Sequence, residues 1–119
     1  METVYIYSID KKISMEEFLN HTYQPGHAYK INDHYFQKCI SKDLETNEPK
    51  IESITILSNI NGGIYQLDYT PNEQPMPSGD FVNCIMSGKI KEVDPEKFDQ
   101  LVMTFKEMSH SLERIALSI

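Results

Sequence analysis

Histidines are the first residues in this chain that could carry chemistry. Three of the four, His21, His27 and His34, lie within 14 residues of one another, and Asp33 and Cys39 are close by. Imidazole, carboxylate and thiolate groups bind Zn²⁺ when three or four of them converge, usually at short and regular spacing. The intervals of six and seven residues between these histidines match no such pattern. We therefore expect neither a metal site nor a cofactor.

The two cysteines are the other candidate nucleophiles. A catalytic thiol needs a partly exposed, electropositive environment, whereas Cys39 and Cys84 both lie inside apolar runs. That placement predicts buried free thiols in a reducing cytoplasm. Paired carboxylates occur where helices are predicted to begin, and the sequence contains no phosphate-binding loop and no serine-hydrolase motif. These patterns favour a binding protein over an enzyme.

The charge of the chain indicates the kind of partner. Its 119 residues include 18 acidic and 11 basic side chains, which gives a net charge of −7, and no Lys or Arg occurs between Ile51 and Gly88. Nucleic acids and anionic membranes need clustered cations, so we expect neither as a direct partner. Carboxylates can instead mimic phosphate charge in a basic cleft. The sequence predicts a small acidic protein-binding module, such as an inhibitor, an immunity protein or an adaptor, that docks on a basic site.

Six residues are the candidate partner-binding positions. They combine carboxylates and a tyrosine of the acidic stretch with apolar residues of the C-terminal segment: Asp68, Tyr69, Glu73, Asp80, Met103 and Leu117. Tyrosine suits an interface because it has a large apolar body and a polar tip. Met103 and Leu117 lie away from the buried stripe of a predicted helix. An exposed apolar column of this kind could also form the interface of a homodimer.

The tyrosines support an alternative function. Six of the seven fall on predicted strands or extended segments. A curved sheet that packs on a helix can enclose a pocket lined by tyrosine and methionine side chains. The alternative is therefore a small-molecule-binding domain, either a sensor or a sequestering protein. An enclosed cavity between helix and sheet would distinguish it from the docking module.

The first half of the chain predicts a strand, a short helix and a second strand. Val4–Ile9 is β-branched and aromatic on both faces, which is typical of a central strand. Ser14 and Glu17 form a capping box for the helix, which we expect to end before Pro25. An extended segment then ends in a strand at Tyr35–Ile40. The polar segment that follows, residues 41–50, reads as a loop.

The second half predicts a hairpin and a further strand. Ile51–Ser58 and Ile64–Tyr69 alternate as paired strands do, and a turn at Asn61–Gly63 joins them. Thr70–Asp80 holds three prolines and a glycine, and we expect an exposed loop without regular structure. Phe81–Val93 reads as a long strand, with Gly88 as a bulge or bend.

The chain is predicted to end in a long helix, from Pro95 to about Leu117. Apolar residues recur there at alternating steps of three and four, as on one buried face of a helix: Phe98, Leu101, Phe105, Met108, Leu112, Ile115 and Ile119. We expect an α+β fold in the order β-α-β-β-β-β-α, with the helix packed across one face of a four- to five-stranded, mainly antiparallel sheet. Residues 1–119 would form a single domain. We also expect no signal peptide and no membrane-spanning segment.

Overall fold

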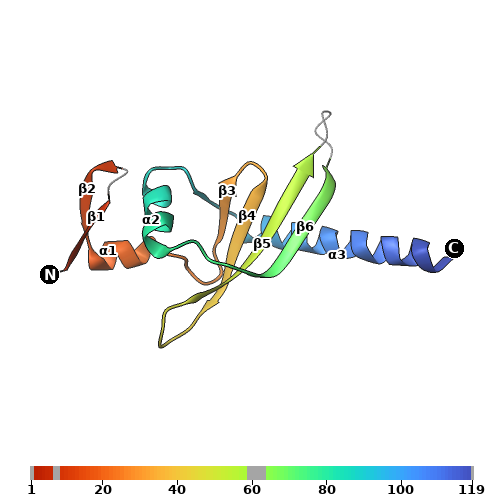
Figure 1. Cartoon of the computed structure of the whole chain (residues 1–119), viewed down its shortest axis with the longest axis horizontal. Helices are drawn as coiled ribbons and strands as arrows, with labels where there is room; N and C mark the ends of the chain where they lie inside the picture. The colour runs from red at the N-terminus through yellow and green to blue at the C-terminus, as the bar shows by residue number, and fades with distance from the viewer. Residues whose placement is uncertain (1, 7–8, 59–63, 119) are drawn as a thin grey trace.

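The chain has the predicted α+β architecture, in which a long C-terminal helix packs against an antiparallel sheet (Figure 1). The computed structural model describes the backbone of residues 2–6, 9–58 and 64–118. Side chains are described for residues 2–6, 9–57 and 67–107. Within this part of the chain, five strands form the main sheet in the order β6-β5-β4-β3-β7, and two more form a separate sheet. No helix in these ranges is both long and apolar enough to cross a membrane.

The N-terminal residues form a separate two-stranded ribbon, so the prediction of a central strand at Val4–Ile9 is wrong. β1 (Thr3–Ile6) pairs antiparallel with β2 (Lys11–Ser14), and neither strand joins the main sheet. Asp10, between them, has a φ of 49°, a left-handed conformation that aspartate tolerates better than most residues. The ribbon buries its apolar side against the rest of the protein and not in the centre of a sheet.

The short helix α1 (Met15–Asn20) begins where the capping box predicts. The Oγ of Ser14 accepts the backbone N–H of Glu17 at 3.1 Å, which satisfies a donor that has no partner within the helix. The helix ends at Asn20, with His21 as its C-cap, and so stops before Pro25 as expected.

The main sheet contains the predicted hairpin at its acidic edge. The strands of the main sheet are β3 (Ala28–Asn32), β4 (Tyr35–Lys42), β5 (Pro49–Ser58), β6 (Ile64–Glu73) and β7 (Lys91–Val93). β5 and β6 pair antiparallel, with Ile54 opposite Tyr69 and Thr55 opposite Asp68. The predicted turn at Asn61–Gly63 lies outside the described residues. β6 runs on to Glu73, so the segment Thr70–Asp80 is not a loop throughout.

The predicted strand at Phe81–Val93 is wrong for most of its length, and this is the largest error in the sequence-based interpretation. α2 (Ser78–Met86) occupies the first part, and only Lys91–Val93 is a strand. A short apolar run cannot distinguish a buried strand from a buried helix. Gly88, with a φ of 80°, follows the C-cap of α2, a position where glycine commonly ends helices; it is not a bulge in a strand.

α2 covers one face of the sheet and connects two parts of the core. Phe81 is fully buried in a cluster with Tyr23, Tyr29, Cys39, Ile51 and Ile90. Its ring stacks on Tyr23 at a centroid distance of 3.9 Å and meets Tyr29 edge-on at 5.0 Å. The adjacent Val82 packs instead against the N-terminal ribbon. A single helix therefore anchors the ribbon to the main sheet.

α3 (Pro95–Ser118) covers the opposite face of the sheet. The Oδ1 of Asp94 accepts the N–H of Glu96 at 3.0 Å, as expected for a cap. Phe98 and Val102 are buried against Ala28 and Ile54 of the sheet, so the predicted apolar face is confirmed for the described side chains. A helix of 24 residues is about 36 Å long. Figure 1 shows its C-terminal end continuing past β6.

Candidate functional site

The predicted partner-binding residues lie on different faces of the fold. Asp68 and Tyr69 are neighbours on β6 and point to opposite faces of the sheet, because strand side chains alternate. Asp68 is exposed, whereas the half-buried Tyr69 ring lies 5.8 Å from the Phe105 ring of α3. Burial, with a hydrogen bond to the Glu52 carboxylate, raises the pKa of the Tyr69 hydroxyl to about 12. Tyr69 therefore contributes to the core under α3.

The other predicted positions are dispersed too. Asp80 is exposed in the first turn of α2, where its charge complements the helix dipole. Met103 is 61% exposed on the outer side of α3. Leu117 belongs to α3, but its side chain lies outside the described part of the chain.

Glu73 takes part in a hydrogen-bond network inside the protein. The Ser53 hydroxyl donates to its Oε2 at 2.9 Å, and the Gln74 N–H donates to its Oε1 at 2.9 Å. These bonds lower the pKa of the Glu73 carboxyl, and the bond from Ser53 has the largest effect. A further hydrogen bond from the Tyr35 hydroxyl also lowers it. Ser53 is buried, so Glu73 also satisfies a hydroxyl that water does not reach.

The network continues across the sheet toward α2. The buried Gln37 side chain donates to the Tyr35 hydroxyl at 3.0 Å and accepts from the Tyr23 hydroxyl at 2.5 Å. The Tyr23 oxygen in turn accepts the N–H of Met76 at 3.2 Å. A polar line therefore joins four strands or segments that are distant in sequence. Charged and amide groups that are satisfied in this way specify how the segments pack.

The Glu73→Gln variant is expected to lose part of the pH dependence of folding. Because the folded-state pKa of Glu73 is lowered, this carboxylate stabilises the protein above its unfolded pKa. The contribution disappears as pH falls through the folded-state value. We expect the wild type to lose about 1 kcal/mol more than Glu73→Gln between neutral pH and about pH 3. Urea unfolding at a series of pH values measures the difference.

A matched control tests whether the effect belongs to the network. Glu45→Gln removes the same charge at an exposed position and should follow the wild-type pH dependence. An equally steep acid destabilisation in Glu73→Gln would show that the Ser53 contact contributes nothing.

The tip of the β4–β5 hairpin is a feature that sequence reasoning missed. The sequence predicts only a polar loop over residues 41–50, which is wrong at both ends because β4 runs to Lys42 and β5 begins at Pro49; residues 43–48 form the tip. The Oδ1 of Asp43 accepts the N–H groups of Glu45 at 2.8 Å and Thr46 at 2.9 Å. The N–H of Asn47 donates to the Asp43 carbonyl at 2.9 Å, and the Asp43 N–H to the Glu48 carbonyl at 3.0 Å. Asn47 adopts a φ of 62°, which asparagine tolerates. The tip is thus a closed, internally bonded turn.

This turn holds an apolar side chain out in solvent. Leu44 is the most exposed large hydrophobic residue among those described, at 101% of its reference area. The carboxylates of Asp43, Glu45 and Glu48 flank it, and all three residues are exposed. Hydrogen bonds from Thr46 and Glu45 lower the pKa of Asp43, so its carboxyl stays ionised. Figure 1 shows the hairpin projecting away from the sheet. In the sequence, the signal that could have indicated this exposed side chain is a single leucine between two acidic residues.

His21 and His27, two of the three histidines considered as metal ligands, line a cleft of about 270 Å³ on the sheet face opposite α3. Its lining comes from the end of α1, the following segment, β3, α2, the residue before β7, and β7 itself: Asn20, His21, Thr22, Gln24, His27, Tyr29, Ile85, Ile90 and Glu92. His34 is not among them; it lies in the turn between β3 and β4. No group of three potential metal ligands occurs among the described residues.

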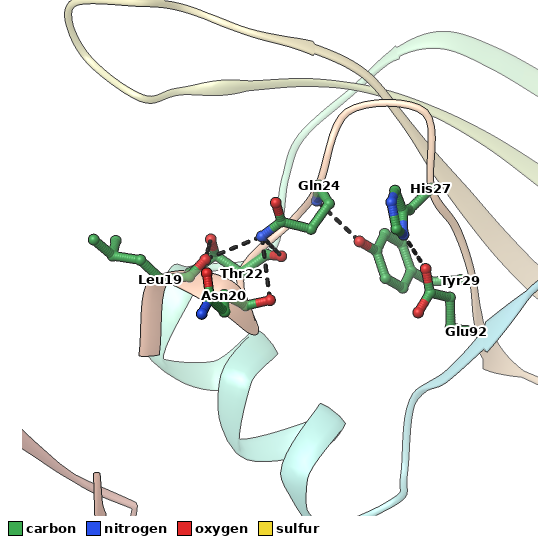
Figure 2. Close-up of polar contacts among 7 residues, drawn as sticks. All are labelled: Leu19, Asn20, Thr22, Gln24, His27, Tyr29 and Glu92. Carbon is green, nitrogen blue, oxygen red and sulfur yellow. Dashed lines mark hydrogen bonds and ion pairs between the residues drawn. The ribbon is translucent and has the colours of Figure 1, made fainter. Parts of the chain in front are cut away.

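Most of the polar groups in this cleft already bind one another (Figure 2). The Gln24 amide donates to the carbonyl oxygens of Leu19, Asn20 and Thr22 at 3.0, 3.3 and 2.9 Å. Its backbone N–H donates to the Tyr29 hydroxyl at 2.9 Å, and His27 pairs with Glu92. These contacts fix the segment between α1 and β3. The cleft therefore has a structural explanation that requires no ligand.

Both cysteines are free thiols, as predicted. Cys39 is fully buried, and burial raises the pKa of its thiol, so it is a poor nucleophile at neutral pH. The prediction that Cys84 is buried as well is wrong, because Cys84 is only partly buried on α2.

Comparisons of the chain with models of protein families, with curated proteins and with solved structures found no match. The surface of this chain is therefore the only indication of its function. Among the features above, the hairpin tip combines an exposed apolar side chain, concentrated charge and a rigid backbone.

Proposed function

We propose that this chain is a small acidic protein-binding module, acting as an inhibitor, an immunity protein or an adaptor, and that it docks through the tip of the β4–β5 hairpin on a basic site of its partner. The observation that carries the proposal is the fully exposed Leu44 among three exposed carboxylates. The net charge of −7 supports it, because an acidic surface is steered toward a basic one.

The energetics of docking favour a tip of this kind. Burying a leucine side chain in a partner's pocket contributes about 1.5–3 kcal/mol. The hydrogen bonds that the Asp43 carboxylate accepts already order the turn, so little conformational entropy remains to be lost on binding. The surrounding carboxylates raise the association rate and select a partner with Lys or Arg around its pocket. Leucine supplies affinity, and the charges supply specificity.

The remaining predicted positions are dispersed over the fold and do not form one surface with the hairpin tip. Asp68 and Asp80 are exposed and add to the acidic charge of the protein, whereas Tyr69 and Glu73 serve mainly inside the protein. We place the protein in the cytoplasm, because its two free thiols suit a reducing compartment. A homodimer that forms through α3 is a separate proposal, which is based on the exposed side chain of Met103. Nucleic acid and membranes are not part of this proposal.

The alternative function, a small-molecule pocket between helix and sheet, has less support. Phe98 and Val102 of α3 fill the space against Ala28 and Ile54. The cleft lies on the other face, its lining includes one tyrosine and no methionine, and its polar groups are largely engaged.

Leu44→Asp is expected to abolish partner capture and to leave the fold intact. The side chain has no contacts to lose, so the free energy of unfolding should change by less than about 0.5 kcal/mol. Immobilised wild type and variant would be exposed to the same cell lysate at low and high salt, and bound proteins identified by mass spectrometry. We expect a basic protein that the wild type retains at low salt, releases at high salt, and that the variant does not retain.

Met103→Asp is the matched control, because it places the same charge on an exposed apolar position of α3. It should capture the partner as the wild type does. Loss of capture only in Met103→Asp would move the interface to α3 and refute docking through the hairpin tip. Equal capture by all three proteins would refute both surfaces.

A further inference from the structure

The structure brings three of the eleven basic residues to one hollow at the β7 edge of the sheet. This hollow, of about 210 Å³, is lined by Lys30 and Asn32 of β3, by Asp33 of the following turn, by Lys89 just before β7, and by Lys91, the first residue of β7. The lysines at 30 and 91 are 61 positions apart in a chain with a net charge of −7. Nothing in the sequence pattern predicts this cluster.

Two of these lysines face each other directly across the strand pair. Lys30 and Lys91 are register partners of β3 and β7, so their side chains project from the same face of the sheet. Like charges in that position repel and destabilise a sheet. The Asp33 carboxylate lies 3.2 Å from the Lys30 ammonium and offsets one of the charges. Lys89 adds a third ammonium group. The hollow therefore contains three ammonium groups and one carboxylate, which gives it a net charge of +2.

We propose that this hollow binds the phosphate group of a small molecule. A phosphate monoester carries a charge of about −1.5 to −2 at neutral pH, which matches the net charge of the hollow. Lysine binds phosphate as a mobile point charge and needs no bidentate geometry. The Asn32 side chain adds a neutral donor: its Oδ1 accepts the N–H of His34 at 2.8 Å, and its NH₂ has no acceptor among the described residues.

The charge around the hollow favours a compact anion over a nucleic acid. A nucleic acid binds along a path of cations, each of which neutralises one phosphate. The three lysines of the hollow lie together at one edge of the sheet, and at the opposite edge β6 carries Asp68 and Glu73, with no Lys or Arg from Ile51 to Gly88. A polyanion would meet repulsion beyond the hollow, whereas a single phosphate or diphosphate group would not.

Titration of the full chain with inorganic phosphate and with pyrophosphate tests the proposal. Amide chemical shifts would be followed at constant ionic strength, with chloride replaced by the anion. We expect saturable shifts at Lys30, Asn32, Lys89 and Lys91, with pyrophosphate the tighter ligand. Lys91→Gln should weaken phosphate binding about tenfold, the effect of losing one charge-assisted hydrogen bond. The Lys91→Gln variant should also have a Tm no lower than that of the wild type, because the substitution removes the charge repulsion between Lys91 and Lys30.

The control is Lys106→Gln, which makes the same charge change at an exposed position of α3. It should bind phosphate as the wild type does. Equal weakening in both variants, or shifts that rise without saturating, would reduce the effect to general charge screening and overturn the site. Tight binding of a short DNA oligonucleotide that displaces pyrophosphate would overturn the assignment to a small molecule.

Discussion

Phe81→Ala is expected to destabilise the protein by about 3–5 kcal/mol, the usual cost of removing a fully buried phenylalanine. The Phe81 ring has no exposed area and lies against both Tyr23 and Tyr29. Its loss leaves a cavity and removes two aromatic contacts. It also uncovers the ring face of Tyr23, whose hydroxyl joins Gln37 to the backbone of Met76. The typical stability of a domain is only about 5–15 kcal/mol, so this single change could bring the protein close to unfolding.

Urea unfolding followed by circular dichroism measures this effect. Leu44→Ala provides the comparison, since its side chain is fully exposed and its replacement should change stability by less than about 0.5 kcal/mol. A loss below about 1 kcal/mol for Phe81→Ala would mean that α2 does not cover the sheet. The cluster around Phe81 would then have to be assigned differently.

Phe98→Ala is expected to have a similar cost, about 3–5 kcal/mol, but on the opposite face of the sheet. Phe98 is 1% exposed and packs with Ala28 and Ile54. A helix in water gains most of its stability from packing of its apolar face and little from intrinsic propensity. Phe98 is the most buried of the described side chains on α3. Its removal should therefore loosen the docking of the helix as well as create a cavity.

Two measurements distinguish this result from a general loss of stability. Met103→Ala, on the same helix but 61% exposed, should be nearly neutral in urea unfolding. Native-state hydrogen exchange should accelerate most in α3 in the Phe98→Ala protein. Equal destabilisation by Phe98→Ala and Met103→Ala would contradict the orientation of the helix.

Local signals in the sequence were sufficient for the elements whose cause is local. The Ser14–Glu17 cap involves residues three apart, and it starts α1 as predicted. The alternation in the β5 and β6 segments and the apolar face of α3 are likewise repeated within short windows. These patterns also imply the α+β class, because an amphipathic helix and a sheet each need a partner for their apolar faces.

The errors occurred where packing over long distances chose between locally equivalent structures. Phe81–Val93 satisfies both the strand and the helix period over its first residues, and the positions of Phe81 and Val82 between two clusters decide for α2. The N-terminal apolar segment also suited a central strand. It instead pairs with β2 in a separate ribbon because its buried side meets α2.

The sequence by itself determined the acidic character of the protein, its free thiols and the local starts of α1 and α3. The tertiary structure alone decided that Tyr69 faces α3, that Glu73 satisfies Ser53, that Leu44 stands in solvent and that Lys30 meets Lys91. The physical reason is the range of the interactions. Capping and periodicity act over a few residues, whereas exposure and charge pairing depend on which distant segments the whole fold brings together.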